Sequence, residues 1–389
     1  MDNSEHSRRH RLLWNIAYYP AWLFFRLRYN YHPKVQPIDG PSIIVSNHVT
    51  DLDPLLLALT VRKFTYFVAS EHVFRRFGKL LTWAQGPISR MKGTTAGSTA
   101  MTILRRVRKG FNVALFPEAN RTFNGVNLAI VESTAKLVRS SGASLVTHRF
   151  RGGYFTSPRW SGNSVRRGRM TGEVVGVYPP EQLKKMKPEE IAELIRRDIR
   201  EDAYETQAEW KIPYKGKNLA EHIERTLCVC PVCGELGAMT SHGDTFGCRA
   251  CGMTGKYTEL GYIEGDGLPF RTVTEWDVWQ AHELQKRADA AGDACVAEDD
   301  DIDLHEVNDD FEEFPVARGR LRMFADRLEL DGRRFPLGEI SGIAINGPQI
   351  LTITAKDRHY TFTSENIVNL RKYITLFYAF TAPEKILSL

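Results

Sequence analysis

A histidine and an aspartate, His48 and Asp53, stand five residues apart behind a short apolar run. Residues 42–46 should form a buried strand, and Asp53 followed by Pro54 is typical of a helix start. The turn between strand and helix can bring the carboxylate onto the imidazole. Histidine is well suited to take a proton near neutral pH, and a carboxylate on its second nitrogen stabilises the imidazolium that forms. The pair would therefore deprotonate a hydroxyl group bound beside it.

A second charged segment, Phe116–Thr122, lies 70 residues further along the chain and also follows an apolar run. This second segment is needed because the spacing of His48 and Asp53 alone is weak evidence for a catalytic pair. Asp53 could be only a helix cap, and His48 only an ordinary loop histidine. Together the two segments resemble the glycerolipid acyltransferase family, whose signatures are Asn-His-x4-Asp and Phe-Pro-Glu-Gly-Thr-Arg. The resemblance extends over about residues 10–215.

The resemblance implies an enzyme that moves a fatty acyl group from a thioester of coenzyme A or acyl-carrier protein to the hydroxyl of a lysophospholipid, first of all lysophosphatidate. It makes His48 the general base and Asp53 its partner. It also implies an acceptor-binding set, which consists of Asn47, Arg90, Glu118 and Arg121. Arg121 would contact the acceptor's phosphate, because a guanidinium binds phosphate through two hydrogen bonds. Ala119 and Asn120 replace the family's Gly and Thr, so another lysolipid or a glycolipid stays open as acceptor.

Short apolar runs alternate with helical patterns across residues 41–215, the expected acyltransferase domain. This alternation predicts an α/β fold with a mixed, largely parallel sheet and flanking helices. Within the region, residues 144–172 carry six arginines and no acidic residue. Such a stretch suits an anionic partner, such as lipid headgroups, the phosphates of coenzyme A or an acidic carrier protein, and a solvated basic loop is the alternative.

Residues 1–40 contain an apolar stretch rich in aromatic residues, 12–25, which is preceded by Arg8, Arg9 and Arg11. No apolar run reaches the roughly 18 residues that a transmembrane helix needs. Arginine beside tryptophan and tyrosine is typical of a segment in a bilayer interface. We therefore expect a membrane-surface amphipathic segment and a peripheral protein on the cytoplasmic face of a membrane. The alternative is a helix that packs on the protein's own core.

Two Cys-x2-Cys pairs stand in the region 216–290, and their members are Cys230, Cys233, Cys248 and Cys251. This spacing predicts a zinc ribbon in which four thiolates complete a tetrahedral, structural zinc site. Two disulfides are the rival interpretation, and they are disfavoured where thiols stay reduced. The local charges are balanced, so no nucleic-acid partner is expected, whereas a protein partner stays open.

The last part of the chain changes in composition. Residues 293–313 contain eleven acidic and no basic residues, which predicts an acidic, mobile linker over 291–316. Strand patterns and a final helix over 317–389 predict a small β-rich domain that weakly resembles the pleckstrin-homology arrangement. Its arginines would either face anionic lipid or form the solvated face of half-buried strands.

The whole chain has 389 residues, of which 42% are hydrophobic and 25% charged, and its net charge is +5. This length exceeds what one core usually holds, so several domains are expected. The alternative to an enzyme is a membrane-bound adaptor that binds partners through the zinc ribbon and the C-terminal domain. The intact signature residues argue against it, because an adaptor would be free to lose them.

Overall fold

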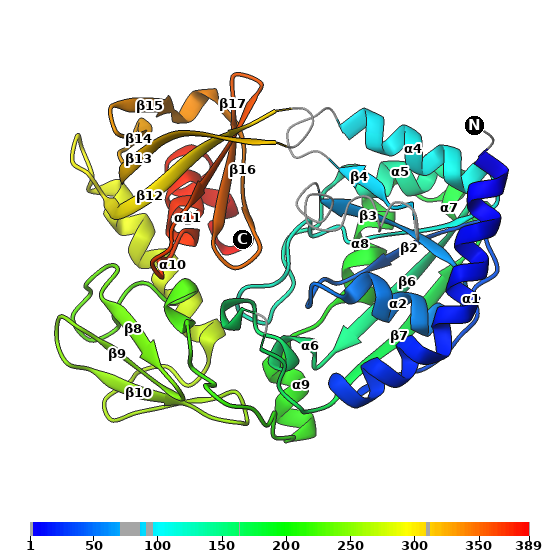
Figure 1. The fold of residues 1–389 in the computed structure, drawn as a ribbon, viewed down its shortest axis with the longest axis horizontal. Helices are drawn as coiled ribbons and strands as arrows, with labels where there is room; N and C mark the ends of the chain where they lie inside the picture. The colour runs from blue at the N-terminus through cyan, green and yellow to red at the C-terminus, as the bar shows by residue number, and fades with distance from the viewer. Residues whose placement is uncertain (1–2, 71–85, 91–95, 163, 309–311, 389) are drawn as a thin grey trace. The chain divides into compact units, whose positions relative to one another are not determined.

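The computed structural model describes most of the chain, which divides into two compact units (Figure 1). The described residues are 3–70, 86–90, 96–162, 164–308 and 312–388. The first unit comprises Met1–Pro158 and Val165–Tyr214. The second unit comprises Arg159–Ser164 and Lys215–Leu389.

A seven-stranded sheet forms the centre of the first unit, in the order β1-β7-β6-β2-β5-β3-β4. Neighbouring strands run parallel except β6 and β7, which are antiparallel. The predicted mixed, largely parallel sheet is therefore confirmed. The strands span Tyr31–Pro33 (β1), Ser42–Ser46 (β2), Thr65–Ser70 (β3), Ile88–Arg90 (β4), Asn112–Leu115 (β5), Ser144–Arg151 (β6) and Met170–Tyr178 (β7).

Helices cover both faces of this sheet. In β2, Ile43 and Val45 enter one core and Ile44 enters the other. A strand that is buried on both faces needs apolar residues without alternation, which is why this segment is a continuous apolar run. The first core includes residues of α4, α5, α7 and α8, and the second includes residues of α1 and α2. The helices span Asn3–Arg28 (α1), Asp53–Val61 (α2), Ala96–Arg108 (α4), Ser133–Ser141 (α5), Gly153–Thr156 (α6), Pro180–Lys185 (α7), Pro188–Ile199 (α8) and Ala203–Trp210 (α9).

The carboxyl ends of β2 and β5 lie side by side, because the two strands are parallel and Val45 pairs with Leu115. The segments that follow them, residues 47–52 and 116–122, therefore leave the same edge of the sheet. In open α/β sheets this edge is where ligands commonly bind. Polar groups that are 70 positions apart in the sequence can meet there.

The second unit contains two antiparallel sheets. One has the order β11-β10-β9-β8, and the other has the order β15-β14-β13-β12-β18-β17-β16. The strands of the smaller sheet span Met239–His242 (β8), Thr245–Cys248 (β9), Thr254–Tyr257 (β10) and Ile263–Glu264 (β11). The larger sheet consists of Ala297–Val307 (β12), Glu313–Met323 (β13), Arg327–Leu330 (β14), Arg333–Pro336 (β15), Ile340–Asn346 (β16), Ile350–Ala355 (β17) and Arg358–Thr363 (β18). The helices are Val273–Asp289 (α10) and Arg371–Thr381 (α11), the latter after the last strand.

The acidic segment β12 corrects the predicted linker over residues 291–316. It pairs with β13 on one side and with β18 on the other, so it lies within the larger sheet. Its apolar residues Ile302 and Leu304 are fully buried. The prediction was wrong because an acidic run was judged without the basic strand that pairs with it. The β-rich domain thus begins with β12 and not at residue 317. The pleckstrin-homology-like arrangement stays a prediction.

Arginines of the larger sheet face these carboxylates. Arg320 Nε donates to Asp300 Oδ1 at 2.6 Å, and Arg358 Nε donates to Glu306 Oε1 at 2.7 Å. Ion pairs between exposed groups contribute little stability. These pairs nevertheless offset the positive charge of the arginines, which binding of an anionic lipid would require. The contacts favour the second interpretation of these arginines, a solvated face of paired strands.

Candidate active site

Asp53 holds the loop after β2 through both carboxylate oxygens. His48 Nδ1 donates to Asp53 Oδ2 at 2.8 Å, and the N–H groups of Val49 and Thr50 donate to the same oxygen at 2.6 and 3.0 Å. The Thr50 hydroxyl donates to Oδ1 at 2.7 Å. Asp53 is fully buried where α2 begins, and Pro54 suits this first turn because it has no N–H to satisfy. The carboxylate therefore fixes the turn that presents His48.

The imidazole of His48 keeps one nitrogen for a substrate. A carboxylate only accepts hydrogen bonds, so Nδ1 carries the hydrogen and Nε2 carries the lone pair. The ring stacks on Phe116 with the two centroids 4.5 Å apart, and the side chain is 20% exposed. A partly exposed basic nitrogen, with a buried carboxylate behind the ring, is what general-base catalysis needs. The structure brings the predicted pair together, and its catalytic role stays a prediction.

Glu118 supports the same loop from the end of β5. Its carboxylate accepts from the backbone N–H of His48 at 3.2 Å, from Asn127 Nδ2 at 2.8 Å and from the N–H of Leu128 at 2.9 Å. Burial raises the pKa of Glu118 to about 8, and these three donors oppose the shift. The contacts describe a structural brace, whereas the resemblance implied acceptor binding.

Arg121 is buried, with 7% of its surface exposed, and each of its three guanidinium nitrogens donates to the protein. Nε donates to the carbonyl of Val49 at 3.1 Å, and Nη2 donates to the carbonyl of Ser157 at 2.7 Å. Nη1 donates to Asp51 Oδ2 at 2.8 Å. The guanidinium thus holds the His48 loop, and the predicted contact with the acceptor's phosphate stays a prediction. Sequence reasoning missed Asp51, whose charge within the first signature was the signal that could have found it.

Ala119 stands where the family signature has glycine, and its φ is 60°. A side chain in this left-handed region costs about 1–2 kcal/mol, which explains why glycine suits the position. The turn keeps its form nevertheless. The N–H of Ala119 donates to the carbonyl of Phe116, and the N–H of Thr122 donates to the carbonyl of His48 at 3.1 Å. The second bond joins the two signature loops.

Asn47 and Arg90 complete the predicted acceptor-binding set. Asn47 Oδ1 accepts from the N–H of Phe150 at 2.8 Å, and its Nδ2 donates to the carbonyl of Phe150 at 3.0 Å. The buried amide thereby ties the end of β2 to β6, which is a structural contact. Arg90 ends β4, and its side chain lies outside the described residues.

The arginine-rich stretch 144–172 finds partners within the protein. Arg149 Nη2 donates to Glu173 Oε1 at 3.1 Å, and Arg151 Nη2 donates to Glu209 Oε2 at 2.5 Å. These pairs offset part of the charge on which the expected anionic partner would depend. The acidic partners lie beyond the stretch in the sequence, so its composition alone did not show them.

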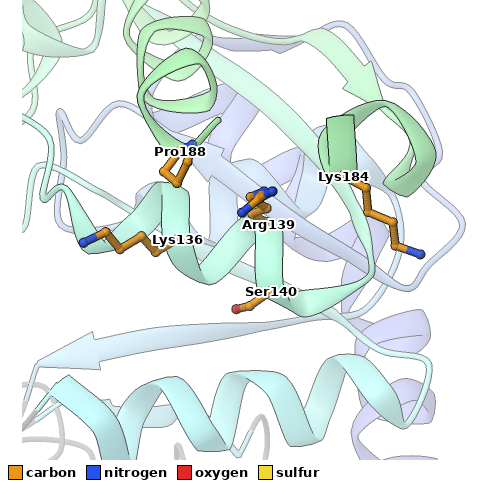
Figure 2. A pocket seen from close by; sticks show the side chains of 5 residues that line it. All are labelled: Lys136, Arg139, Ser140, Lys184 and Pro188. Atoms are coloured by element: carbon orange, nitrogen blue, oxygen red, sulfur yellow. The ribbon is translucent and has the colours of Figure 1, made fainter. Parts of the chain in front are cut away.

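A basic hollow of about 260 Å³ lies elsewhere in the first unit (Figure 2). It is lined by Lys136, Arg139, Ser140, Lys184 and Pro188. The helix α5 leads into the start of β6, and α7 follows the end of β7, where Tyr178 pairs with Leu145. The hollow therefore lies at the opposite edge of the sheet from His48 and takes no part in the candidate active site.

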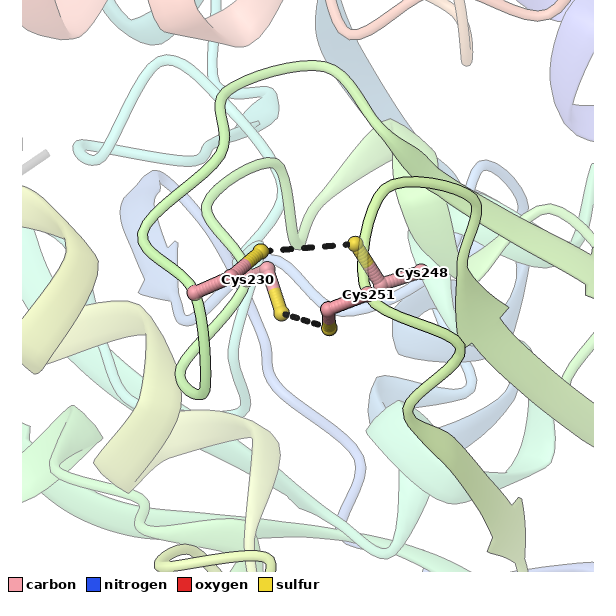
Figure 3. Close-up of side chains that lie close together, drawn as sticks. Cys230, Cys248 and Cys251 are labelled. Atoms are coloured by element: carbon pink, nitrogen blue, oxygen red, sulfur yellow. Dashed lines mark hydrogen bonds between the residues drawn. The ribbon is translucent and has the colours of Figure 1, made fainter.

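Cys230, Cys248 and Cys251 point toward one another (Figure 3). The sulfur atoms of these three and of Cys233 all lie within 4.8 Å of one another. The Sγ atoms of Cys230 and Cys251 are 3.7 Å apart, and those of Cys233 and Cys248 are 3.8 Å apart. Four sulfurs that bind a zinc ion at about 2.3 Å lie about 3.8 Å from one another in a tetrahedron. The residues therefore fit a zinc ion, and as free thiols they do not form the rival disulfides.

Comparisons with known proteins give one family match. Residues 27–151 match the model of the acyltransferase family, and this range includes both signatures. The crystal structure of the 1-acyl-sn-glycerophosphate (LPA) acyltransferase PlsC from Thermotoga maritima is similar at 17% identity and a TM-score of 0.41, over 51% of this chain and 82% of that chain. No curated protein matches the chain. The acyltransferase match thus lies within the first unit and includes the segment that holds His48 and Asp53.

Proposed function

We propose that this protein is an O-acyltransferase that moves a fatty acyl group from coenzyme A or acyl-carrier protein to a hydroxyl group of a lysolipid. The observation that carries the proposal is the hydrogen bond from His48 Nδ1 to the buried carboxylate of Asp53. Lysophosphatidate is the acceptor that the family resemblance puts first. Another lysolipid or a glycolipid is the alternative acceptor.

The proposed reaction needs one proton transfer in each direction. His48 Nε2 takes the proton of the acceptor hydroxyl while its oxygen attacks the thioester carbonyl carbon. The C–S bond of the tetrahedral intermediate then breaks, and the imidazolium returns the proton to the leaving thiolate. Asp53 stabilises the imidazolium between the two steps. The N–H groups of Val49 and Thr50 are bonded to Asp53, so other donors must stabilise the oxyanion.

The first helix supports a position on a membrane surface. One face of α1 packs into the core with Trp14, Tyr18 and Phe25. The remaining face exposes a set of large apolar side chains, namely Leu12, Ile16, Tyr19, Leu23, Phe24 and Leu27. An apolar helix face of this kind suits insertion into a bilayer interface. Within the described ranges, no helix is long and apolar enough to cross a bilayer.

A structural zinc ion held by the four cysteines completes the proposal. It would stabilise the turns around β8 and β9 and supply no chemistry to His48. Thiolate coordination by all four ligands leaves no open position for a substrate.

Thiol release from an acyl-coenzyme A, measured with and without a panel of lysolipids, tests the reaction. We expect acceptor-dependent release by the wild type and its loss, by at least about a hundredfold, in His48→Ala. His282→Ala, which removes an exposed histidine of α10, is the matched control and should retain full activity. If the wild type released no thiol with coenzyme A or carrier-protein donors, the adaptor hypothesis would replace the enzyme.

A further inference from the structure

Asn127 joins the carboxylate of Glu118 to the main chain in front of α9. Its Nδ2 donates to Glu118 Oε1 at 2.8 Å, and its Oδ1 accepts from the backbone N–H of Glu201. Because a backbone N–H can only donate, it fixes the amide oxygen toward Glu201 and the NH2 group toward Glu118. The same Oε1 accepts from the backbone N–H of His48 at 3.2 Å. A chain of hydrogen bonds therefore runs from residue 201 to the candidate base.

The main chain around Asn127 is held by bonds that do not involve its side chain. The N–H of Leu128 donates to Glu118 Oε2 at 2.9 Å. The carbonyl of Gly125 accepts from the N–H of Ala203 at 2.9 Å. The loop is thus held on both sides of residue 127, and we expect a variant that lacks the amide to fold.

The amide of Asn127 holds the oxygen of Glu118 that faces His48. The N–H of Leu128 binds the other carboxylate oxygen, so Asn127 decides how the group is turned about that contact. At 3.2 Å the bond from His48 is longer than the usual ~2.9–3.0 Å, and the contact from Asn127 is the firmer one. A shift of Glu118 would move the backbone nitrogen of the residue that carries the imidazole. Misplacement of a reacting group by about 1 Å can cost about a hundredfold in rate.

We propose that Asn127 is a positioning residue for the base His48, on which it acts through Glu118. The inference rests on the proposed acyl transfer and adds a residue to the machinery of the same site. Asn127 stands nine residues beyond Glu118 and outside both signature segments, so the family resemblance did not point to it. Because its amide orients the base and takes no proton itself, its removal should affect kcat and not the KM for the acceptor.

Asn127→Ala and Asn127→Asp test the inference in the thiol-release assay. Alanine removes both bonds, whereas aspartate keeps the size of the side chain and an oxygen for the N–H of Glu201 but loses the donor to Glu118. Both variants should lower kcat about tenfold and leave the KM for the acceptor within about twofold. Gln182→Ala, which removes an exposed amide of α7, is the control and should match the wild type. An unchanged kcat in the two folded variants would overturn the inference.

A double-substitution cycle separates positioning through Glu118 from a general structural role. In a Glu118→Ala protein the amide of Asn127 has no carboxylate to hold, so the further change Asn127→Ala should alter kcat by less than about twofold. Losses that multiply would show that Asn127 acts independently of Glu118, and they would overturn the inference while the acyl transfer stands. Absence of thiol release by the wild type with every donor and acceptor would overturn both.

Discussion

The carboxylate of Glu118 accepts a hydrogen bond from the backbone nitrogen of His48 at 3.2 Å, although the two residues are 70 positions apart in the sequence. The bond joins the loop after β5 to the loop after β2. A second bond, from the N–H of Thr122 to the carbonyl of His48, acts on the other side of the same residue. The position of His48 thus depends on both signature loops.

Glu118→Gln should change how stability depends on pH. Burial raises the pKa of Glu118 to about 8 from 4.5, so the folded protein retains a proton that the unfolded chain releases between these values. This contribution to stability is fully present below pH 4.5 and is lost as the pH rises through about 8. The variant should lack that loss. The amide of Gln accepts hydrogen bonds at its oxygen but not at its nitrogen, so one of the donors around residue 118 loses its acceptor. The variant should therefore also be about 1–2 kcal/mol less stable than the wild type at pH 5.

Urea unfolding at pH 5 and at pH 8 measures both effects of Glu118→Gln. Glu132→Gln, which changes an exposed residue of a neighbouring segment, serves as the control and should follow the wild type. The same pH dependence in Glu118→Gln and in the wild type would show that Glu118 does not carry it.

Ala119→Gly should stabilise the protein. The residue has a φ of 60°, where glycine has no steric cost, and the gain is partly offset by the greater freedom of glycine in the unfolded chain. We expect a net gain of about 0.5–1 kcal/mol in the free energy of unfolding. Asn120→Gly at the next position, which is outside the left-handed region, should give no gain. Equal effects of the two substitutions would argue against strain at Ala119.

Zinc binding predicts one equivalent of metal per chain. Cys248→Ser should lose the metal and destabilise the second unit by several kcal/mol, because zinc binding contributes directly to the folding of such sites. Cys295→Ser should keep the metal, since this exposed cysteine lies outside the cluster. Metal analysis of the purified proteins and thermal unfolding with a chelator measure the two effects. A wild type that purifies without zinc and does not bind added zinc would refute the site.

The exposed face of α1 predicts binding to vesicles that contain anionic lipid. Ile16→Ser combined with Leu27→Ser should weaken binding at least about tenfold, since each change removes about 1–2 kcal/mol of apolar burial. Asn15→Ala, an exposed polar position of the same helix, is the control. Cosedimentation with vesicles measures the affinity. Equal binding of the double variant and the wild type would show that the exposed face of α1 does not carry the membrane contact.

The sequence sufficed where neighbours in space are also neighbours in the chain. Asp53 meets His48 because a single turn joins them, and the cysteine pairs meet because each lies in its own short loop. It failed where partners come from distant strands. β12 looked like a linker because its basic partners stand on β13, and the sequence did not place Asp51 and Ser157 beside Arg121.

The carboxylate of Asp53 has a catalytic role and a structural role, and substitution of the residue removes both. The same carboxylate that orients the imidazole also ends the loop after β2 and begins α2, without exposure to solvent. Natural variants that lose this acid would therefore lose part of the fold together with the chemistry. A lineage that abandoned acyl transfer would need to rebuild this loop before it could lose Asp53, so an inactive descendant should lose His48 first and keep Asp53.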